Sequence, residues 1–291
     1  MTGASGVQVV PFHHAGSGTW SYLVADGETA VAAVIDPVLD FEAASGRTSA
    51  TLAQALIDEA EARGWRIVWL LETHAHADHL SAAHWLRERL PEACVAVGAD
   101  IVTVQKTFRE VFNLGEPFAT DGSQFDRLLG DGERLPLGAL QIEVIAVPGH
   151  TPDSVAFHID DALFVGDSVS LPDSGTARCD FPGGDAGQLY RSIRRLFALP
   201  GPTRVFVCHD HDTGERPPRC QSDIATQRRE NIHVRDGIDE AEFVAMRKAR
   251  DAALAMPALI LPSIQINIRG GALPEPENNG VRYLKLPLNQ F

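Results

Sequence analysis

Histidine and aspartate residues of the kinds that bind metal ions follow four short apolar segments of the chain. The densest group is Thr73-His74-Ala75-His76-Ala77-Asp78-His79, an HxHxDH pattern directly after the segment Ile67–Glu72. Three further apolar segments end within about three residues of His150, Asp167 and His209. Imidazole and carboxylate groups are preferred ligands of zinc, iron and similar ions. The residues that we expect to converge on one metal centre are His74, His76, Asp78, His79, His150, Asp167 and His209.

These residues need strands to position them, because loops at strand ends are where a rigid scaffold carries functional groups. Short runs rich in β-branched residues, bounded by Gly, Pro and Asp, predict such strands. Residues 155–165 predict a hairpin that turns at Asp160 and Asp161. The predicted strands are Val31–Ile35, Ile67–Leu71, Cys94–Val97, Ile142–Val147, Val155–Ile159, Leu163–Val165 and Arg204–Val207.

Helical patterns alternate with the predicted strands, which favours a layered α/β protein. Gly64 is the expected stop of the first helix. The chain after Leu261 is rich in Pro, Gly and Asn, so we expect an irregular loop at 274–280 and a docked strand or coil at 281–288. The predicted helices are Ser49–Arg63, Leu80–Leu90, Gln188–Phe197 and Glu240–Ala255.

Composition limits the function. The 291 residues include 25 Lys and Arg against 39 Asp and Glu, a formal charge of −14. Nucleic acid and anionic membrane surfaces would repel such a chain, so neither is an expected partner. No apolar run approaches the roughly 20 residues that a membrane helix needs. The start of the chain lacks the pattern of a signal peptide, and the four cysteines form no CxxC pair. We therefore expect a cytoplasmic protein with free thiols.

The motifs resemble those of the metallo-β-lactamase superfamily. The matching features are the HxHxDH loop, Gly149-His150-Thr151, Gly166-Asp167 and His209, and the resemblance spans about residues 8 to 215. It implies a four-layer αβ/βα sandwich with the metal site at one edge. It also implies a catalytic domain over residues 1–230, with residues 231–291 as a C-terminal extension packed on the same domain. One fold hosts many reactions, so the fold leaves the chemistry open.

Two branches of this superfamily imply different reactions. Resemblance to glyoxalase II implies two zinc-type ions and a metal-bound hydroxide that attacks a thioester. In that branch His74, His76 and His150 hold one ion. Asp78, His79 and His209 hold the other, and Asp167 bridges them. A non-enzymatic, metal-dependent binding protein on the same scaffold is a third alternative.

The sequence looks closer to the persulfide dioxygenases. Ala177–Phe181 is similar to an Arg-Thr-Asp-Phe stretch of that family, with Cys179 in place of Thr, and 278–289 resembles the tail of its bacterial members. This resemblance implies a single Fe(II) held by His74, His150 and Asp167. Two His and one carboxylate form the face used by non-haem iron oxygenases. Because all seven ligand-type residues are present, their number alone does not distinguish one iron from two zincs.

The resemblance also implies a substrate. Glutathione persulfide and O2 would give sulfite and glutathione, a reaction of sulfur metabolism and hydrogen sulfide detoxification. His76, Asp78, His79 and His209 would orient ligands or steer protons. Arg178 is the expected substrate-binding residue, since Arg pairs with carboxylates in bidentate fashion; an ion pair with Asp180 is its alternative role. Related enzymes are often dimers, so a homodimer is expected.

Overall fold

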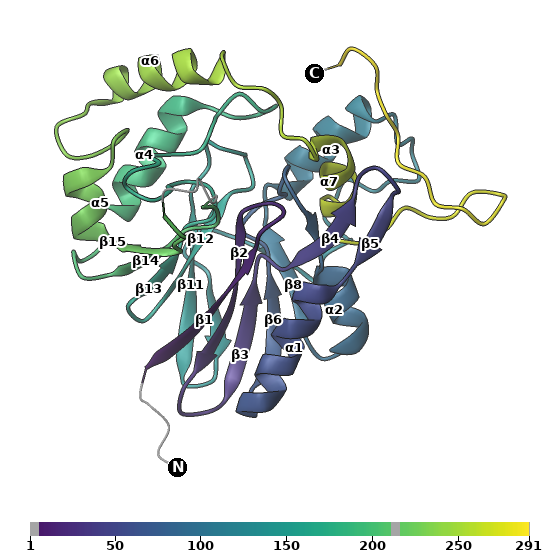
Figure 1. Cartoon of the computed structure of the whole chain (residues 1–291), viewed down its shortest axis with the longest axis horizontal. Helices are drawn as coiled ribbons and strands as arrows, with labels where there is room; N and C mark the ends of the chain where they lie inside the picture. The colour runs from purple at the N-terminus through teal and green to yellow at the C-terminus, as the bar shows by residue number, and fades with distance from the viewer. Residues whose placement is uncertain (1–5, 211–215, 291) are drawn as a thin grey trace.

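Alternating side chains place each of two large sheets between two apolar layers. In β2 (Thr19–Asp26), Leu23 and Ala25 belong to a core shared with helices, whereas Tyr22 and Val24 belong to a core shared with the second sheet. A period of two in which both faces are apolar is typical of a strand covered on both sides. The computed structural model describes residues 6–210 and 216–290 in this arrangement, shown in Figure 1.

Within the described residues, the first sheet has six strands. The hairpin strands pair antiparallel, and from β3 onward the neighbours β3, β6, β8 and β9 run parallel. Because β3 and β6 run parallel, their carboxyl ends lie at the same edge. The strands in spatial order are β1 (Val7–His14), β2, β3 (Val31–Ile35), β6 (Arg66–Leu71), β8 (Cys94–Gly98) and β9 (Arg127–Leu129).

The second sheet, also six-stranded over the described ranges, is antiparallel except between β13 and β14. As a result β11, β13 and β14 all run in one direction and end at one edge. Its strands in spatial order are β10 (Arg134–Leu137), β11 (Leu140–Ala146), β12 (Val155–Ile159), β13 (Ala162–Phe164), β14 (Arg204–Phe206) and β15 (Gln221–Asp223). A small sheet is formed by β5 (Arg47–Ser49), β4 (Val38–Glu42) and β7 (Leu80–Ser81).

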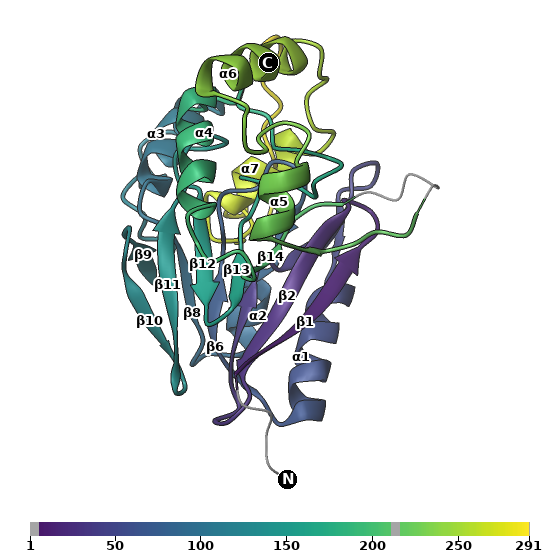
Figure 2. The same ribbon diagram turned by 90° about the vertical axis from the view of Figure 1, so that its left-hand side faces the viewer.

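Helices cover the outer face of each large sheet and complete four layers (Figure 1 and Figure 2). On the first sheet lie α1 (Thr51–Arg63), α2 (Ala83–Arg89), α3 (Ile101–Val111) and α7 (Ile260–Asn267). On the second lie α4 (Ala186–Leu196), α5 (Ile224–Glu230) and α6 (Glu240–Asp251). Asp185 and Asp239 cap the first turns of α4 and α6 by accepting backbone hydrogen bonds. The expected α/β sandwich is confirmed.

The predicted strands all form, with ends shifted by at most two residues. The hairpin turn at Asp160 is confirmed, with Ile159 paired to Ala162, and Gly64 ends α1 in the left-handed conformation. The predicted helix over 80–90 is wrong at its start, because Leu80 pairs with Leu39 in β7 and the helix begins at Ala83. No helix was predicted at 260–267, yet α7 forms there because its apolar residues pack into the core of the first sheet. The boundary at residue 230 between the catalytic domain and the C-terminal extension stays a prediction.

The C-terminal segment lies against α7. The segment 281–288 is coil in contact with α7, where Lys285 N–H donates to Gln265 Oε1 at 2.9 Å. Among the described residues, no helix combines the length and apolar character that crossing a membrane requires.

The layer between the two sheets predicts which substitutions destabilise the fold. Phe157, with none of its surface exposed, packs there beside Tyr22 and Phe164. We expect Phe157→Ala to lower the free energy of unfolding by about 3–5 kcal/mol, because it leaves a cavity in this layer. Urea denaturation measures this loss. Leu286→Ala is the control, since Leu286 is 68% exposed and its loss should change stability by less than about 0.5 kcal/mol. Equal effects of the two substitutions would contradict the described core.

Candidate metal centre

The ends of four strands bring the ligand-type residues together at one edge of the sandwich. The HxHxDH loop follows β6, His150 follows β11, Asp167 follows β13 and His209 follows β14. His74 Nε2 and His150 Nε2 lie 3.6 Å and 3.5 Å from the same oxygen, Oδ2 of Asp167. Thr19 at the start of β2 bridges to His209, which ties the two sheets together at this edge. The three atoms therefore surround one point that an ion could occupy.

Buried ring nitrogens without a partner mark the site as one that fits a cation. Within the described ranges, His74 Nε2, His76 Nδ1 and His79 Nε2 are buried and accept or donate no hydrogen bond. Buried polar atoms are almost always paired, so three orphaned nitrogens on one loop require an explanation. A metal ion at this position would satisfy the lone pairs of such nitrogens. The residues present thus fit a metal centre.

Hydrogen bonds set the tautomers of the two histidines beside Asp167. His150 Nδ1–H donates to the carbonyl oxygen of Arg178 at 2.7 Å, which leaves Nε2 with a free lone pair. The hydroxyl of Thr73 donates to Asp36 Oδ2 at 2.9 Å, so its oxygen accepts from His74 Nδ1–H at 3.1 Å. Both imidazoles consequently present Nε2 as a ligand atom toward Asp167. Such outer partners orient metal-binding histidines in proteins.

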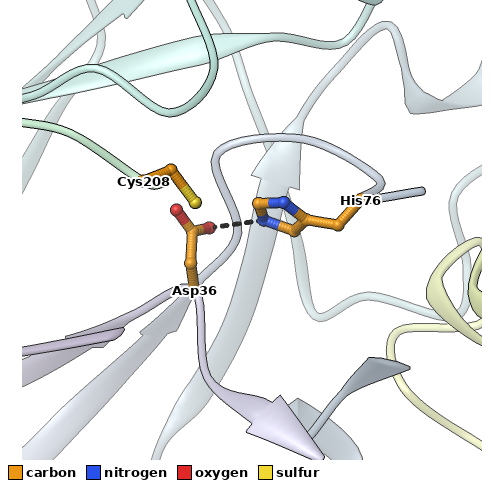
Figure 3. A group of neighbouring side chains, drawn as sticks. All are labelled: Asp36, His76 and Cys208. Carbon is orange, nitrogen blue, oxygen red and sulfur yellow. Dashed lines mark hydrogen bonds and ion pairs between the residues drawn. The ribbon is translucent and has the colours of Figure 1, made fainter. Parts of the chain in front are cut away.

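Asp36, which directly follows β3, points its carboxylate toward His76 of the HxHxDH loop (Figure 3). Its carboxylate accepts from the Thr73 N–H at 2.7 Å and from His76 Nε2 at 3.0 Å. Burial opposes protonation of His76, but the charges of Asp36 and Glu72 outweigh it and raise its pKa to about 9. Cys208 lies beside this pair, and burial raises the pKa of its thiol well above the ordinary value. Asp36 therefore fixes the position of His76 and holds the N–H of Nε2, and an ion at Nδ1 would have to displace the second ring proton.

His209 joins the carboxylates of Asp78 and Asp167. Its Nε2 lies 2.5 Å from Asp78 Oδ2, and its Nδ1 lies 2.6 Å from Asp167 Oδ1. Burial lowers the pKa of His209, but the two carboxylates outweigh that effect and hold it well above its usual value. Burial likewise raises the pKa of Asp167, yet His209 and the other histidines hold it below its usual range. His209 is thus a protonated link between the two acids.

His79 shares a hydrogen-bonding partner with His209. Thr19 Oγ1 lies 3.3 Å from His79 Nδ1 and 3.1 Å from His209 Nε2, so one hydroxyl touches both rings. Burial and the charge of His76 lower the pKa of His79 to about 4. The ring is therefore neutral, and its orphaned Nε2 is available to a ligand.

A cavity of about 490 Å³ opens onto the centre. Asp78, His150, Asp167 and His209 line it, and Arg178 lines it as well. The Arg178 guanidinium donates to both carboxylate oxygens of Asp180, at 2.6 Å and 2.7 Å, and to Ala255 O at 2.7 Å. The volume lies within the ordinary range of small-molecule sites. Arg178 thus borders the cavity with three of its five N–H donors engaged, two of them in the ion pair with Asp180 that its alternative role involves.

Two aspartates that support the loop were not predicted from the sequence. Asp36 holds Thr73 and His76, and Asp153 Oδ2 accepts from the Ala75 N–H at 2.8 Å. A signal for Asp36 was available, because it ends the apolar segment Val31–Ile35 in the same way that Asp167 ends its own strand. Asp153 follows no such segment, so its role depends on contacts that the sequence does not display.

Several known proteins are similar to this chain in sequence. A probable metallo-hydrolase of Burkholderia pseudomallei is 52% identical over 93% of this chain and 95% of its own length. Glyoxylase B2 of Dictyostelium discoideum is 47% identical over 94% of each chain. The mitochondrial persulfide dioxygenase ETHE1 of Bos taurus is 32% identical over 66% of this chain and 64% of its own.

A solved structure and a family model extend these similarities to the fold and the superfamily. The crystal structure of ETHE1 from Myxococcus xanthus superposes with a TM-score of 0.73 and 28% identity, covering 91% of this chain and all of the other. These homologues support the resemblance to the persulfide dioxygenase branch. The model of the metallo-beta-lactamase superfamily matches residues 15–209, which include every ligand-type residue of the centre. The chain belongs to the metallo-beta-lactamase superfamily.

Proposed function

We propose that the protein is an iron-dependent persulfide dioxygenase, which oxidises glutathione persulfide with O2 to sulfite and glutathione. The observation that carries the proposal is the convergence of His74 Nε2 and His150 Nε2 on one oxygen of Asp167. Two imidazoles and one carboxylate form the facial set of non-haem iron oxygenases. The similarity to the persulfide dioxygenase ETHE1 of Bos taurus supports this choice within the superfamily.

Contacts of the remaining ligand-type residues support a single ion. Both ring nitrogens of His209 are engaged with carboxylates, and His76 Nε2 is held by Asp36. A second ion on Asp78, His79 and His209 would have to replace the hydrogen bond between His209 and Asp78. We therefore assign iron to His74, His150 and Asp167, and we assign His76, Asp78, His79 and His209 to orienting those ligands and moving protons.

The reaction needs both redox chemistry and proton handling. A bound ferrous ion would supply an accessible redox state and open positions, whereas zinc has no accessible redox state. One persulfide, one O2 and one water give one thiol, one sulfite and two protons, with both O2 atoms on the outer sulfur and the S–S bond broken. His209 lines the cavity and already shares protons with Asp78 and Asp167. Because both ring nitrogens carry protons toward carboxylates, we infer that His209 relays protons between Asp78 and Asp167.

The cavity wall and the cysteines bear on the substrate and the compartment. We propose that Arg178 contributes to the substrate side of the cavity. Its own backbone carbonyl oxygen also accepts the hydrogen bond that orients His150. The four cysteines form no disulfide in the described part of the chain, which suits a reducing cytoplasm. The homodimer stays a prediction.

A dinuclear zinc thioester hydrolase is the second candidate, and specific observations favour it. His76 Nδ1 and His79 Nε2 are buried and unpartnered, as the ligands of a two-metal centre would be before binding. The relatives from Burkholderia pseudomallei and Dictyostelium discoideum bear the names metallo-hydrolase and glyoxylase. Oxygen uptake and metal binding separate the two candidates.

Oxygen uptake tests the reaction directly. Iron-loaded protein given glutathione persulfide in a sealed electrode chamber should consume one O2 for each sulfite formed, because both oxygen atoms end on one sulfur. Sulfite is measured in the same samples, with zinc-loaded protein as the control that should consume none. Iron-loaded protein that leaves O2 untouched but hydrolyses a glutathione thioester would exclude the dioxygenase.

Single substitutions test the ligand assignment. We expect His74→Ala, which removes a proposed ligand, to abolish iron binding, whereas His76→Ala should retain iron and lose about 10–100-fold in activity or metal affinity. The two residues are neighbours on one loop with comparable burial, so each is a matched control for the other. Iron is measured by elemental analysis of each purified variant, with thermal unfolding to verify folding. Loss of iron in His76→Ala and retention in His74→Ala would reverse the assignment.

The support that Asp36 gives to the loop predicts a remote effect on the metal. We expect Asp36→Ala to weaken metal affinity about 10–100-fold, because Thr73 and His76 lose their common acceptor. Asp26→Ala is the matched control, since Asp26 is also a buried acid at a strand end but accepts from Thr29 and Ala139 instead. It should change stability and leave metal affinity intact. Affinity is measured by competition with a chelator, and equal affinities of the two variants would exclude this role of Asp36.

A further inference from the structure

One arginine on the wall of the cavity carries an uncompensated charge. Arg178, Arg247 and Arg250 line the cavity. Arg178 is paired with Asp180, and Arg247 donates to Asp251 Oδ1 from Nε at 2.8 Å and from Nη2 at 2.6 Å. In the part of the chain that the structure describes, Arg250 forms no ion pair or hydrogen bond through its guanidinium. The cavity therefore has one spare positive charge, supplied by the last turn of α6.

A buried imidazole on the same wall presents an unused donor. The Thr176 N–H donates to His233 Nδ1 at 3.0 Å, so Nδ1 is unprotonated and the ring proton lies on Nε2. His233 is 5% exposed, and its Nε2 has no partner among the described residues. Burial and the charges of Arg250 and Arg247 lower the pKa of His233 to about 4, so the ring stays neutral. A buried N–H without an acceptor indicates a missing one.

We propose that Arg250 and His233 Nε2–H form a carboxylate subsite, which binds an acidic end of the thiol carrier whose sulfur reaches the metal centre. This inference rests on the proposed function, since it concerns the carrier of the same substrate. The carrier is accordingly a thiol with at least one carboxylate, and an uncharged thiol would lack this contact. On a chain of charge −14, such a local cation is what allows an anionic substrate to bind.

The cavity joins this subsite to the centre. His150 and Asp167 line it together with Arg250 and His233, and Thr176, which fixes the tautomer of His233, lines it too. A carboxylate that meets both donors makes charge-assisted hydrogen bonds, which are stronger than neutral ones. The subsite thus recognises charge at one part of the cavity while the sulfur chemistry takes place at another.

A purely structural role for Arg250 makes a different prediction. A basic residue in the last turn of a helix is favourable through the helix dipole. Lys248 occupies the same last turn of α6, is exposed and carries the same charge, but it does not line the cavity. Arg250→Ala and Lys248→Ala therefore remove equal charges from one helix end, and only the first should affect a bound carboxylate.

Affinity for glutathione itself tests the subsite without any turnover. Isothermal titration of metal-loaded protein with glutathione should show binding that Arg250→Ala weakens at least about tenfold, the loss expected for a hydrogen bond to a charged group. Lys248→Ala should bind within about twofold of the unmodified protein. N-acetylcysteamine, a thiol without a carboxylate, should bind the unmodified protein and Arg250→Ala equally. His233→Gln, with Thr176 retained, should weaken glutathione by a smaller factor than Arg250→Ala.

The outcomes separate this inference from the proposed function. Equal glutathione affinities of Arg250→Ala and Lys248→Ala, or no binding of glutathione by the unmodified protein, would overturn the subsite even if oxygen uptake were observed. A selective loss in Arg250→Ala supports the subsite even if the protein consumed no O2. Metal content of each variant is measured in parallel and should be unchanged, because neither residue contacts the ligand set.

Discussion

The Asp167 carboxylate is the contact on which the site depends, because three imidazoles meet it. His74 and His150 approach one of its oxygens, and His209 binds the other. These four residues come from the ends of four different strands in two sheets, so their meeting requires the whole sandwich to close at this edge. Partly buried charge of this kind persists only with compensating partners. The protein supplies one in His209, and a cation beside His74 and His150 would supply another.

Much of this arrangement could be predicted from the sequence, for physical reasons. Apolar runs that end in His or Asp predicted the strands and the residues that converge at their ends, since strand direction determines where their carboxyl ends lie. The partners of those residues could not be predicted in the same way. Asp36 reaches Thr73 across 37 positions of chain, and no local pattern encodes that contact. The helix α7 escaped prediction because packing against the first sheet stabilises it despite its irregular surroundings.

The charges around the cavity illustrate a further limit of sequence patterns. Arg178 and Arg250 are the same residue type, so residue type does not distinguish them. In the chain, Arg178 lies nearer to a ligand residue. In the structure Asp180 engages Arg178, and Arg250 keeps its charge unpaired. Which arginine is free for an anion depends on its neighbours in space. In the same way, seven ligand-type residues suit one iron or two zincs, and the contacts of His209 and His76 with carboxylates are the basis on which we propose different roles for them.

The most direct test of this account is the metal content of the freshly purified protein, measured by elemental analysis against protein concentration. If His74, His150 and Asp167 alone bind the ion, the protein should contain one iron per chain and no stoichiometric zinc. Two zinc ions per chain would contradict the account, because they would require Asp78, His79 and His209 to leave their present partners and act as ligands.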